Sequence, residues 1–363
     1  MAPIPRKGIA PPPLPPRGPG EDDADLEEFL EGLTTTIRIV GCGGGGCNTI
    51  NRLAAEGIPG ITLIAANTDA QHLLMIHATH KVLLGRRTTR GRGAGALPEI
   101  GHQSALESAE QLTALIRGTD LLFLTCGLGG GTGTGSIPVV AKLAKDLGIL
   151  TLAVVTLPFG AEGAARMRNA ERGLEELRQH ADTVIVVPND GLLALVPKLP
   201  VEAAFKVADE VLMRSIKGIT EIITRPGLVN LDFSDIRTIL KGGGVALIGM
   251  GEGSGEGRAH EAVEEALHSP LVEVDTSAAL GALVKVSGGP DMSLAEAEQV
   301  VEDIAKAIAP EARIIWGASV DMALERTLRV MVVLTGVESR QILGRTSKRV
   351  RRKLRGDGVD QVG

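Results

Sequence analysis

Between Thr36 and about Asn189, short apolar runs alternate several times with longer stretches that carry apolar residues at helical spacing. Such alternation is typical of an α/β fold, in which helices cover both faces of a mostly parallel sheet. The apolar runs predict strands at Thr36–Val40, Thr62–Ala66, Val82–Leu84, Leu121–Thr125, Thr151–Thr156 and Thr183–Val187.

The rest of the chain predicts one long helix and a second group of strands. Val201 to Arg225 carries apolar residues at helical spacing without a break until Pro226. Beyond it we expect strands and helices in a second, smaller α/β layer. The expected elements are strands Val245–Gly251, Ala282–Gly288, Ala312–Ala318 and Thr327–Leu334, and helices Arg258–Leu267 and Leu294–Ile308.

The two ends of the chain differ in composition from its middle. Residues 1–20 are rich in proline, which predicts a disordered or polyproline-type arm. Residues 21–35 begin with an acidic stretch and carry Leu26, Phe29, Leu30 and Leu33 at helical spacing, which predicts a short helix. The expected division is therefore the arm, this N-terminal helix, a first domain at 36–200, the long helix at 201–225, a C-terminal domain at 226–340 and a basic tail at 341–363.

Composition excludes several classes of protein. The chain has 363 residues and a net charge of −6, so its overall field does not attract nucleic acid. Its five phenylalanines, one tryptophan and no tyrosine are too few for a surface that stacks bases. No apolar run approaches the roughly 20 residues of a membrane span. The three cysteines favour a reducing compartment. No cysteine or histidine spacing indicates a metal site, and His72, His77 and His80 are expected to be exposed.

The run Gly129–Gly135, GGGTGTG, follows one expected strand and precedes an expected helix that starts near Ser136. Glycines leave the backbone N–H groups accessible, and the N-terminus of a helix favours negative charge. Thr132 and Thr134 add hydroxyl donors. We therefore expect a phosphate-binding loop here, and a flexible linker is the weaker alternative.

A second glycine run follows the first strand and precedes a helix expected to begin at Thr49. Within it, Gly41, Gly43 and Gly46 satisfy the dinucleotide-binding pattern G-x-G-x-x-G, which by itself is weak support for a nicotinamide-dependent dehydrogenase. Neither run is followed by Gly-Lys-Ser/Thr, so a Walker loop is excluded.

Several motifs in a fixed order extend this picture to most of the chain. Together they resemble the FtsZ family of cell-division GTPases, within the tubulin/FtsZ superfamily, over about residues 25–340, and the basic tail is more similar to archaeal members. The motifs are GCGGGGCN (41–48), AANTDAQHL (65–73), TTRGRGAGALPEIG (88–101), GLGGGTGTGSIPVVA (127–141), TLPFGAEG (156–163) followed by Arg166, VPND (187–190), AFKVADEVL (204–212) and NLDFSDIRTIL (230–240).

The resemblance implies a Rossmann-like GTPase domain at 36–200, a long central helix and a smaller C-terminal α+β domain. It also implies binding of GTP or GDP with Mg²⁺. The residues it implies at the phosphates are Gly43, Gly44, Gly45, Gly46, Gly129, Gly130, Gly131, Thr132, Gly133, Thr134 and Gly135, with Arg90, Gly93, Ala94 and Gly95 beside the γ-phosphate.

The same resemblance implies residues for the ribose and the base. Glu162 and Arg166 would lie at the ribose, and Asn48, Asn189 and Asp209 would hydrogen-bond the guanine, on which Phe205 would stack. A carboxylate suits guanine because it accepts bonds from both N1–H and the 2-amino group. The weaker alternative is that Phe205 is a core residue and Asp209 an exposed helix residue without a role in binding.

Asp232 and Asp235 are implied to be catalytic, reaching into the nucleotide pocket of a neighbouring subunit. From the residues alone, these side chains would simply cap a helix. The resemblance further implies a head-to-tail homopolymer in the cytoplasm, at a mid-cell division ring, with membrane adaptors or other division proteins bound through the termini. An alternative is a related filament protein with slow turnover that acts on cell shape or on regulation of division.

Overall fold

The computed structural model describes residues 35–195, 200–224, 227–229, 231–269 and 276–337. The expected arm, nearly all of the expected N-terminal helix and the basic tail lie outside the described residues, as do Arg225, Pro226 and Asn230. None of the described helices combines the length and the apolarity that crossing a membrane requires.

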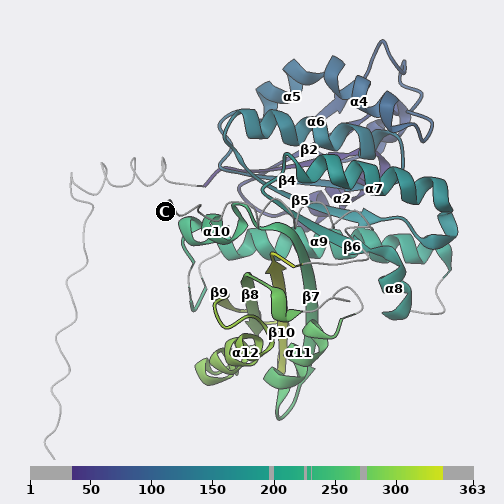
Figure 1. Cartoon of the computed structure of the whole chain (residues 1–363). Coiled ribbons are helices and arrows are strands. Elements are labelled where there is room, and N and C mark those ends of the chain that lie inside the picture. Colours follow the sequence, from purple (N-terminus) through teal and green to yellow (C-terminus); the bar gives the residue numbers. More distant parts are fainter. Residues whose placement is uncertain (1–34, 196–199, 225–226, 230, 270–275, 338–363) are drawn as a thin grey trace, which may run out of the picture. The chain divides into compact units, whose positions relative to one another are not determined.

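The strands of the described residues form one sheet in the order β3-β2-β1-β4-β5-β6-β7-β10-β8-β9 (Figure 1). Neighbours from β3 to β7 are parallel, β10 is antiparallel to both β7 and β8, and β9 is parallel to β8. The bounds are β1 Ile37–Cys42, β2 Ile61–Asn67, β3 His80–Leu83, β4 Leu121–Gly127, β5 Leu150–Leu157, β6 Thr183–Pro188, β7 Gly244–Ser254, β8 Gly281–Gly288, β9 Arg313–Val320 and β10 Thr327–Thr335. The mostly parallel α/β sheet predicted from the sequence is confirmed.

Helices connect nearly all of these strands and cover the sheet. The bounds of the α-helices are α2 Gly43–Glu56, α3 Ala70–Met75, α4 Pro98–Glu107, α5 Ala109–Ile116, α6 Thr132–Asp146, α7 Ala164–Arg178, α8 Asn189–Leu195, α9 Val201–Thr224, α10 Phe233–Leu240, α11 Arg258–Leu267 and α12 Leu294–Ala307. Two short 3-10 helices are η1 Gly160–Glu162 and η2 Thr276–Ala278.

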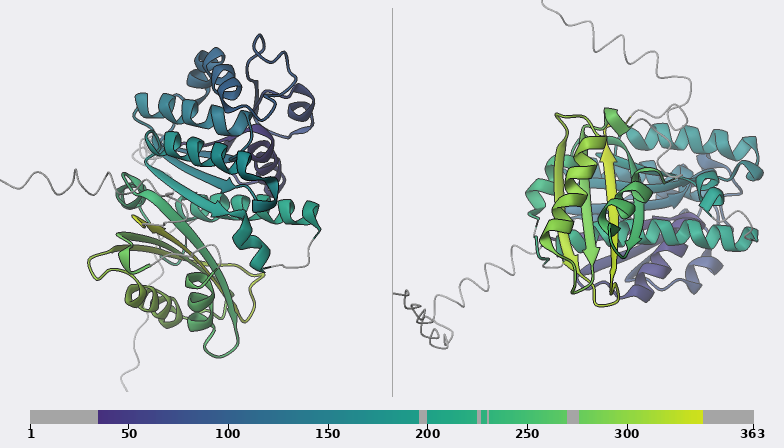
Figure 2. Two further views of the ribbon diagram at one scale, coloured as in Figure 1. Left: turned by 45° about the vertical axis from the view of Figure 1, so that its right-hand side comes forward. Right: turned by 90° about the horizontal axis from the view of Figure 1, so that it is seen from below.

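Two apolar clusters account for the layers. One cluster packs α5, α6, α7, α11 and α12 against the sheet through residues such as Ile137 and Val300. The other packs α2, α3, α9 and α10 through residues such as Ile50, Leu212 and Ile236. In Figure 2 the green-to-yellow C-terminal strands carry α11 and α12 on one face of their sheet. The sheet is therefore apolar on both faces, which explains why its strands are nearly continuous apolar runs.

The structure differs from the sequence-based expectation in two respects. First, the C-terminal strands are not a separate sheet, because β7 pairs in parallel with β6 from Thr183↔Gly244 to Ile185↔Ala246. Second, α2 and α6 begin at Gly43 and Thr132, earlier than the expected starts at Thr49 and Ser136. Glycine is a poor helix former and suggested turns, but here the missing side chains permit close packing that outweighs this preference.

Candidate functional site

The N-termini of α2 and α6 lie next to each other at the carboxyl edge of the sheet. They follow the adjacent parallel strands β1 and β4, where Gly41 pairs with Thr125. Gly43 opens α2 with a φ of +71°, and a Cβ there would lie 2.7 Å from the backbone nitrogen of Gly133. The contact requires glycine for both reasons, and it brings the two glycine runs together.

Both helix N-termini are free to receive an anion. Among the described residues, no side chain caps α2 or α6 and neither helix has an acidic residue in its first turn. The first N–H groups of each helix thus lack partners within the helix and carry partial positive charge. Apart from the adjacent residues and the backbone of the same helix, no described atom lies within 4 Å of a Cβ built on Gly44 or on Gly130. The two runs therefore form an open, donor-rich surface that fits phosphate groups.

The two threonines of the second run are placed differently from each other. Thr134 is 1% exposed, and its Oγ1 accepts a hydrogen bond of 2.9 Å from the Gly129 N–H. Thr132 is half-buried, and its Oγ1 lies 2.6 Å from Oγ1 of Thr68 at the end of β2. Thr134 thus stabilises the run from inside, whereas Thr132 lies nearer its surface.

The segment expected beside the γ-phosphate packs against the second run. Ala94 is buried, and a Cβ added to Gly131 would lie 2.9 Å from the Ala94 Cβ. The Gly93 N–H donates to the Thr68 carbonyl. Arg90, Gly93 and Gly95 all have positive φ, the glycines without strain and Arg90 at φ 53° in a conformation that side chains disfavour. The exposed arginine is thus held by a tightly folded turn beside the glycine run.

Glu162 and Arg166, expected at the ribose, form one unit after β5. The Glu162 carboxylate accepts from the Phe159 N–H at 2.9 Å and pairs with the Arg166 guanidinium at 2.6 Å. Asp190, at the start of α8, accepts from the Gly160 N–H at 3.0 Å and so joins this turn to the neighbouring strand end.

The residues expected at the base come from the first half of α9 and from two helices that contact it, α2 and α8. Phe205 is 40% exposed and is therefore not a core residue, while Phe159 packs edge-on against it with ring centroids 5.1 Å apart. Asn189 follows β6 and is 4% exposed, and its Oδ1 has no hydrogen-bond partner among the described residues. A buried, unpaired acceptor is costly, so it points to a ligand donor.

Asp209 is half-buried rather than exposed. Burial raises the pKa of its carboxyl to about 6, and the Arg52 charge and a hydrogen bond from the Asn48 side chain act in the opposite direction. Asn48 lies on α2, which packs against α9. The structure therefore brings Asn48 and Asp209 together, far apart though they are in sequence.

His72 corrects an expectation from the sequence, because it is half-buried and engaged. Its Nε2 lies 3.1 Å from Asn48 Oδ1 and its Nδ1 lies 3.1 Å from Asn67 Nδ2. His77 and His80 are exposed as expected. Metal-ligand spacing does not identify this residue. The signal in the sequence is Asp69-x-x-His72, in which Asp69 caps a helix and places the His72 ring near its start.

Asp232 and Asp235 are not brought to the glycine runs. Phe205 and Asp209 lie in the first half of α9, whose 24 residues extend for about 35 Å. Asp232 is the N-cap of α10, and Figure 1 shows α8 and α10 at opposite ends of α9. Both aspartates are exposed. Asp232 occupies the N-cap of α10, yet its side chain makes no capping hydrogen bond within the described residues, so the capping explanation fails for this residue.

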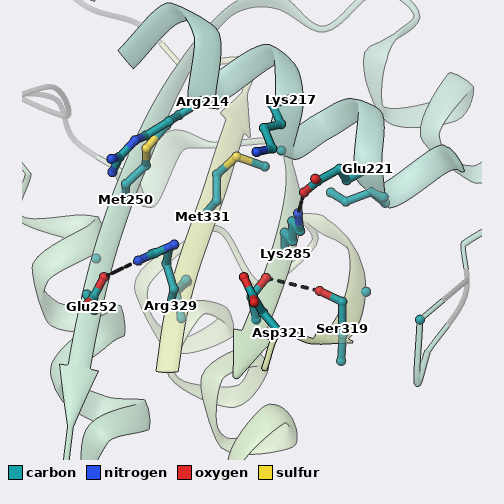
Figure 3. Close-up of a pocket in the computed structure, with 18 of the residues that line it drawn as sticks. Arg214, Lys217, Glu221, Met250, Glu252, Lys285, Ser319, Asp321, Arg329 and Met331 are labelled. Carbon is teal, nitrogen blue, oxygen red and sulfur yellow. Dashed lines mark hydrogen bonds and ion pairs between the residues drawn. The ribbon is translucent and has the colours of Figure 1, made fainter. Parts of the chain in front are cut away.

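A cavity of about 770 Å³ lies elsewhere, between α9 and strands of the C-terminal half (Figure 3). Its wall carries ion pairs, with Lys285 at 2.5 Å from Glu221 and Arg329 at 2.7 Å from Glu252. None of the residues expected at the nucleotide lines it. Because these charges are paired within the wall, the glycine runs are the better anion site.

Comparisons with known proteins agree with this geometry. A family model for the GTPase domain of the Tubulin/FtsZ family matches residues 36–197, and one for the C-terminal domain of the FtsZ family matches residues 244–338. Cell division protein FtsZ 1 of Archaeoglobus fulgidus is 56% identical over 347 residues, which cover 95% of this chain and 94% of that protein. Cell division protein FtsZ of Haloferax mediterranei is 60% identical over 326 residues, 90% and 86% of the two chains. A solved FtsZ dimer of M. jannaschii has a TM-score of 0.83 at 52% identity, covering 87% and 92%.

Proposed function

Because this chain belongs to the FtsZ family, we propose that it binds GTP at its paired glycine runs and hydrolyses it where two copies of the chain meet head to tail. The chain is a GTPase that polymerises and acts in cell division. The resemblance inferred from the sequence motifs is thereby confirmed, and the dehydrogenase alternative is excluded. Residue roles, Mg²⁺ and the geometry of the polymer are proposals.

The observation that supports nucleotide binding best is the pair of uncapped helix N-termini with open space at Gly44 and Gly130. We assign the phosphates to this surface, beside the turn that holds Arg90. The ribose then lies at Glu162 and Arg166. The guanine stacks on Phe205 and hydrogen-bonds to Asn48, Asn189 and Asp209.

Mg²⁺ is proposed to accompany the nucleotide. Among the described residues, no group of three or more His, Cys, Asp or Glu side chains could hold a metal ion. Mg²⁺ commonly keeps several waters and binds through substrate phosphates, so the protein need not supply a ligand cage. When bound, the ion would neutralise part of the phosphate charge.

Hydrolysis is proposed to use Asp232 and Asp235 of the next subunit. Their exposed carboxylates cannot reach the phosphates of their own chain across the length of α9. In a head-to-tail contact they would orient the water that attacks the γ-phosphate and accept its proton. Such a contact joins two different surfaces, so its repetition gives an open filament. The cytoplasm and the mid-cell ring, with adaptors bound at the termini, remain part of this proposal.

Phosphate release at increasing protein concentration tests the shared site. We expect turnover per subunit to be near zero at low concentration and to rise above a threshold, because only assembled subunits have a completed pocket. A second measurement of bound GTP should show saturation on both sides of the threshold. Turnover per subunit that stays constant over the whole range would mean that each chain carries a self-contained site.

The affinity for GTP is expected to depend on the ionisation of Asp209. The carboxylate accepts guanine N–H groups, and its pKa is raised to about 6 by burial, so binding weakens as pH falls through that value. Between pH 7.5 and pH 5 the dissociation constant should rise about tenfold from this group. The free energy of unfolding changes with pH in the opposite direction to GTP affinity. The folded chain binds this proton more tightly than the unfolded chain, so this group lowers the free energy of unfolding as pH rises from about 4 to 6.

Asp209→Asn is the matched control, because it removes the titration and keeps the side-chain size. It should retain only the pH dependence that comes from the phosphates of GTP. Identical pH profiles for the variant and the unmodified chain would remove Asp209 from the base site.

A further inference from the structure

We infer that His72 is a positioning residue for guanine: it holds the Asn48 amide in the orientation that presents the Asp209 carboxylate to the base. This inference rests on the proposed guanine site. It assigns a role to a side chain that lies beyond the residues that the family resemblance implied. A chain of hydrogen bonds from β2 through α3 and α2 to α9 supports it. Its links join Asn67 to His72, His72 to Asn48, and Asn48 to Asp209.

The first link fixes which ring nitrogen of His72 carries the proton. Asn67 is 3% exposed, and its Oδ1 accepts from the Asp69 N–H at 3.2 Å. The oxygen of this amide is thereby identified, so its Nδ2 is the donor toward His72 Nδ1 at 3.1 Å. Nδ1 must accept, and the proton of the neutral ring lies on Nε2.

The second link orients Asn48. The Nε2–H of His72 donates to Asn48 Oδ1 at 3.1 Å, which leaves the Asn48 NH2 group as the donor toward Asp209. Without this bond the exposed amide of Asn48 is free to rotate and to present either end. His72 itself is held by its backbone, because the Asp69 carboxylate caps α3 and accepts from the His72 N–H at 3.1 Å.

The His72 bond should therefore affect recognition of the guanine base and not binding of the phosphates. A correctly oriented Asn48 donor keeps the Asp209 carboxylate in place to accept from both N1–H and the 2-amino group of guanine. Loss of the His72 bond should therefore weaken GTP more than ITP, whose base lacks the 2-amino group, and should leave the phosphate contacts unchanged.

The test compares GTP and ITP binding for His72→Leu, His72→Gln and the unmodified chain at protein concentrations below assembly. We expect the preference for GTP over ITP to fall about fivefold to tenfold in His72→Leu, as for one lost hydrogen bond. His72→Gln keeps a donor and should restore most of the preference. His77→Leu is the matched control, because His77 pairs with Asn51 of α2 at 3.0 Å outside this chain of bonds.

Three results would overturn the inference. Equal fold losses of affinity for GTP and ITP in His72→Leu would indicate a merely structural role, and unchanged affinities for both nucleotides would indicate no role. Nitrogen-15 NMR of the free, unmodified chain should show the Nε2–H tautomer at His72, and the Nδ1–H tautomer would break the first link without any variant. If the unmodified chain itself does not prefer GTP over ITP or ATP, the proposed guanine site is wrong. If it does prefer GTP and only the His72 variants behave unexpectedly, the role of His72 alone is wrong.

Discussion

Asp235→Ala is expected to lower the turnover of GTP by about 100-fold or more while leaving GTP binding and assembly in place. The exposed carboxylate of Asp235 lies in the first turn of α10, away from every residue assigned to the nucleotide. Its removal should therefore affect kcat and not the dissociation constant. Phosphate release and sedimentation of polymer, measured on one sample, check both halves of this prediction.

The neighbouring Ser234→Ala is the control, because Ser234 is exposed on the same turn and has no assigned role. A stricter test mixes Asp235→Ala with Gly44→Ala at a GTP concentration too low for the second variant to bind. Activity of the mixture above that of either variant alone would mean that Gly44→Ala subunits supply aspartates to the pockets of Asp235→Ala subunits. A mixture without any gain would contradict a site shared between copies.

Gly44→Ala should weaken GTP binding by about 100-fold, the equivalent of one lost hydrogen bond to a charged group plus a steric clash. Without a ligand the substitution causes no clash, because no described atom beyond the adjacent residues and the backbone of α2 lies within 4 Å of the added Cβ, and the position lies in the first turn of α2. Alanine is the better helix former, so the free energy of unfolding should rise by up to about 1 kcal/mol. Calorimetric titration should therefore show a lower affinity for GTP, whereas thermal unfolding without ligand should show a higher unfolding temperature.

Gly135→Ala provides the contrast within the other run. A Cβ there would lie 1.9 Å from the Pro98 carbonyl oxygen, so this variant should lose stability as well as affinity. If Gly44→Ala binds GTP as tightly as the unmodified chain, the phosphates do not lie over the start of α2.

Periodicity was enough to predict the sheet, because its strands are buried on both faces and appear as nearly continuous apolar runs. It failed at the carboxyl ends of β1 and β4. These strands continue to Cys42 and Gly127, and the following helices begin inside the glycine runs. The reason is that glycine propensity describes an isolated helix, whereas here Gly133 and Gly135 are selected by contacts with other segments.

The proposed base site could not be derived from spacing. Asn48 and Asp209 meet only because α2 packs on α9, and the resemblance of the motifs supplied that pairing. His72 was overlooked because a neutral histidine that orients an amide needs no second histidine at metal-ligand spacing. Local rules would have placed its ring, since Asp69 caps α3, but no local rule identifies Asn67 and Asn48 as its partners.

In the proposed head-to-tail filament, the separation of Asp232 and Asp235 from the glycine runs along α9 would make the two tips chemically unlike. One tip would end in a nucleotide pocket that no aspartates reach, and the other in aspartates that face no nucleotide. A row of subunits would then always hold one more pocket than it has completed sites. The terminal subunit with the open pocket would keep its GTP until another subunit arrives, so each addition at that tip would trigger hydrolysis one position behind it.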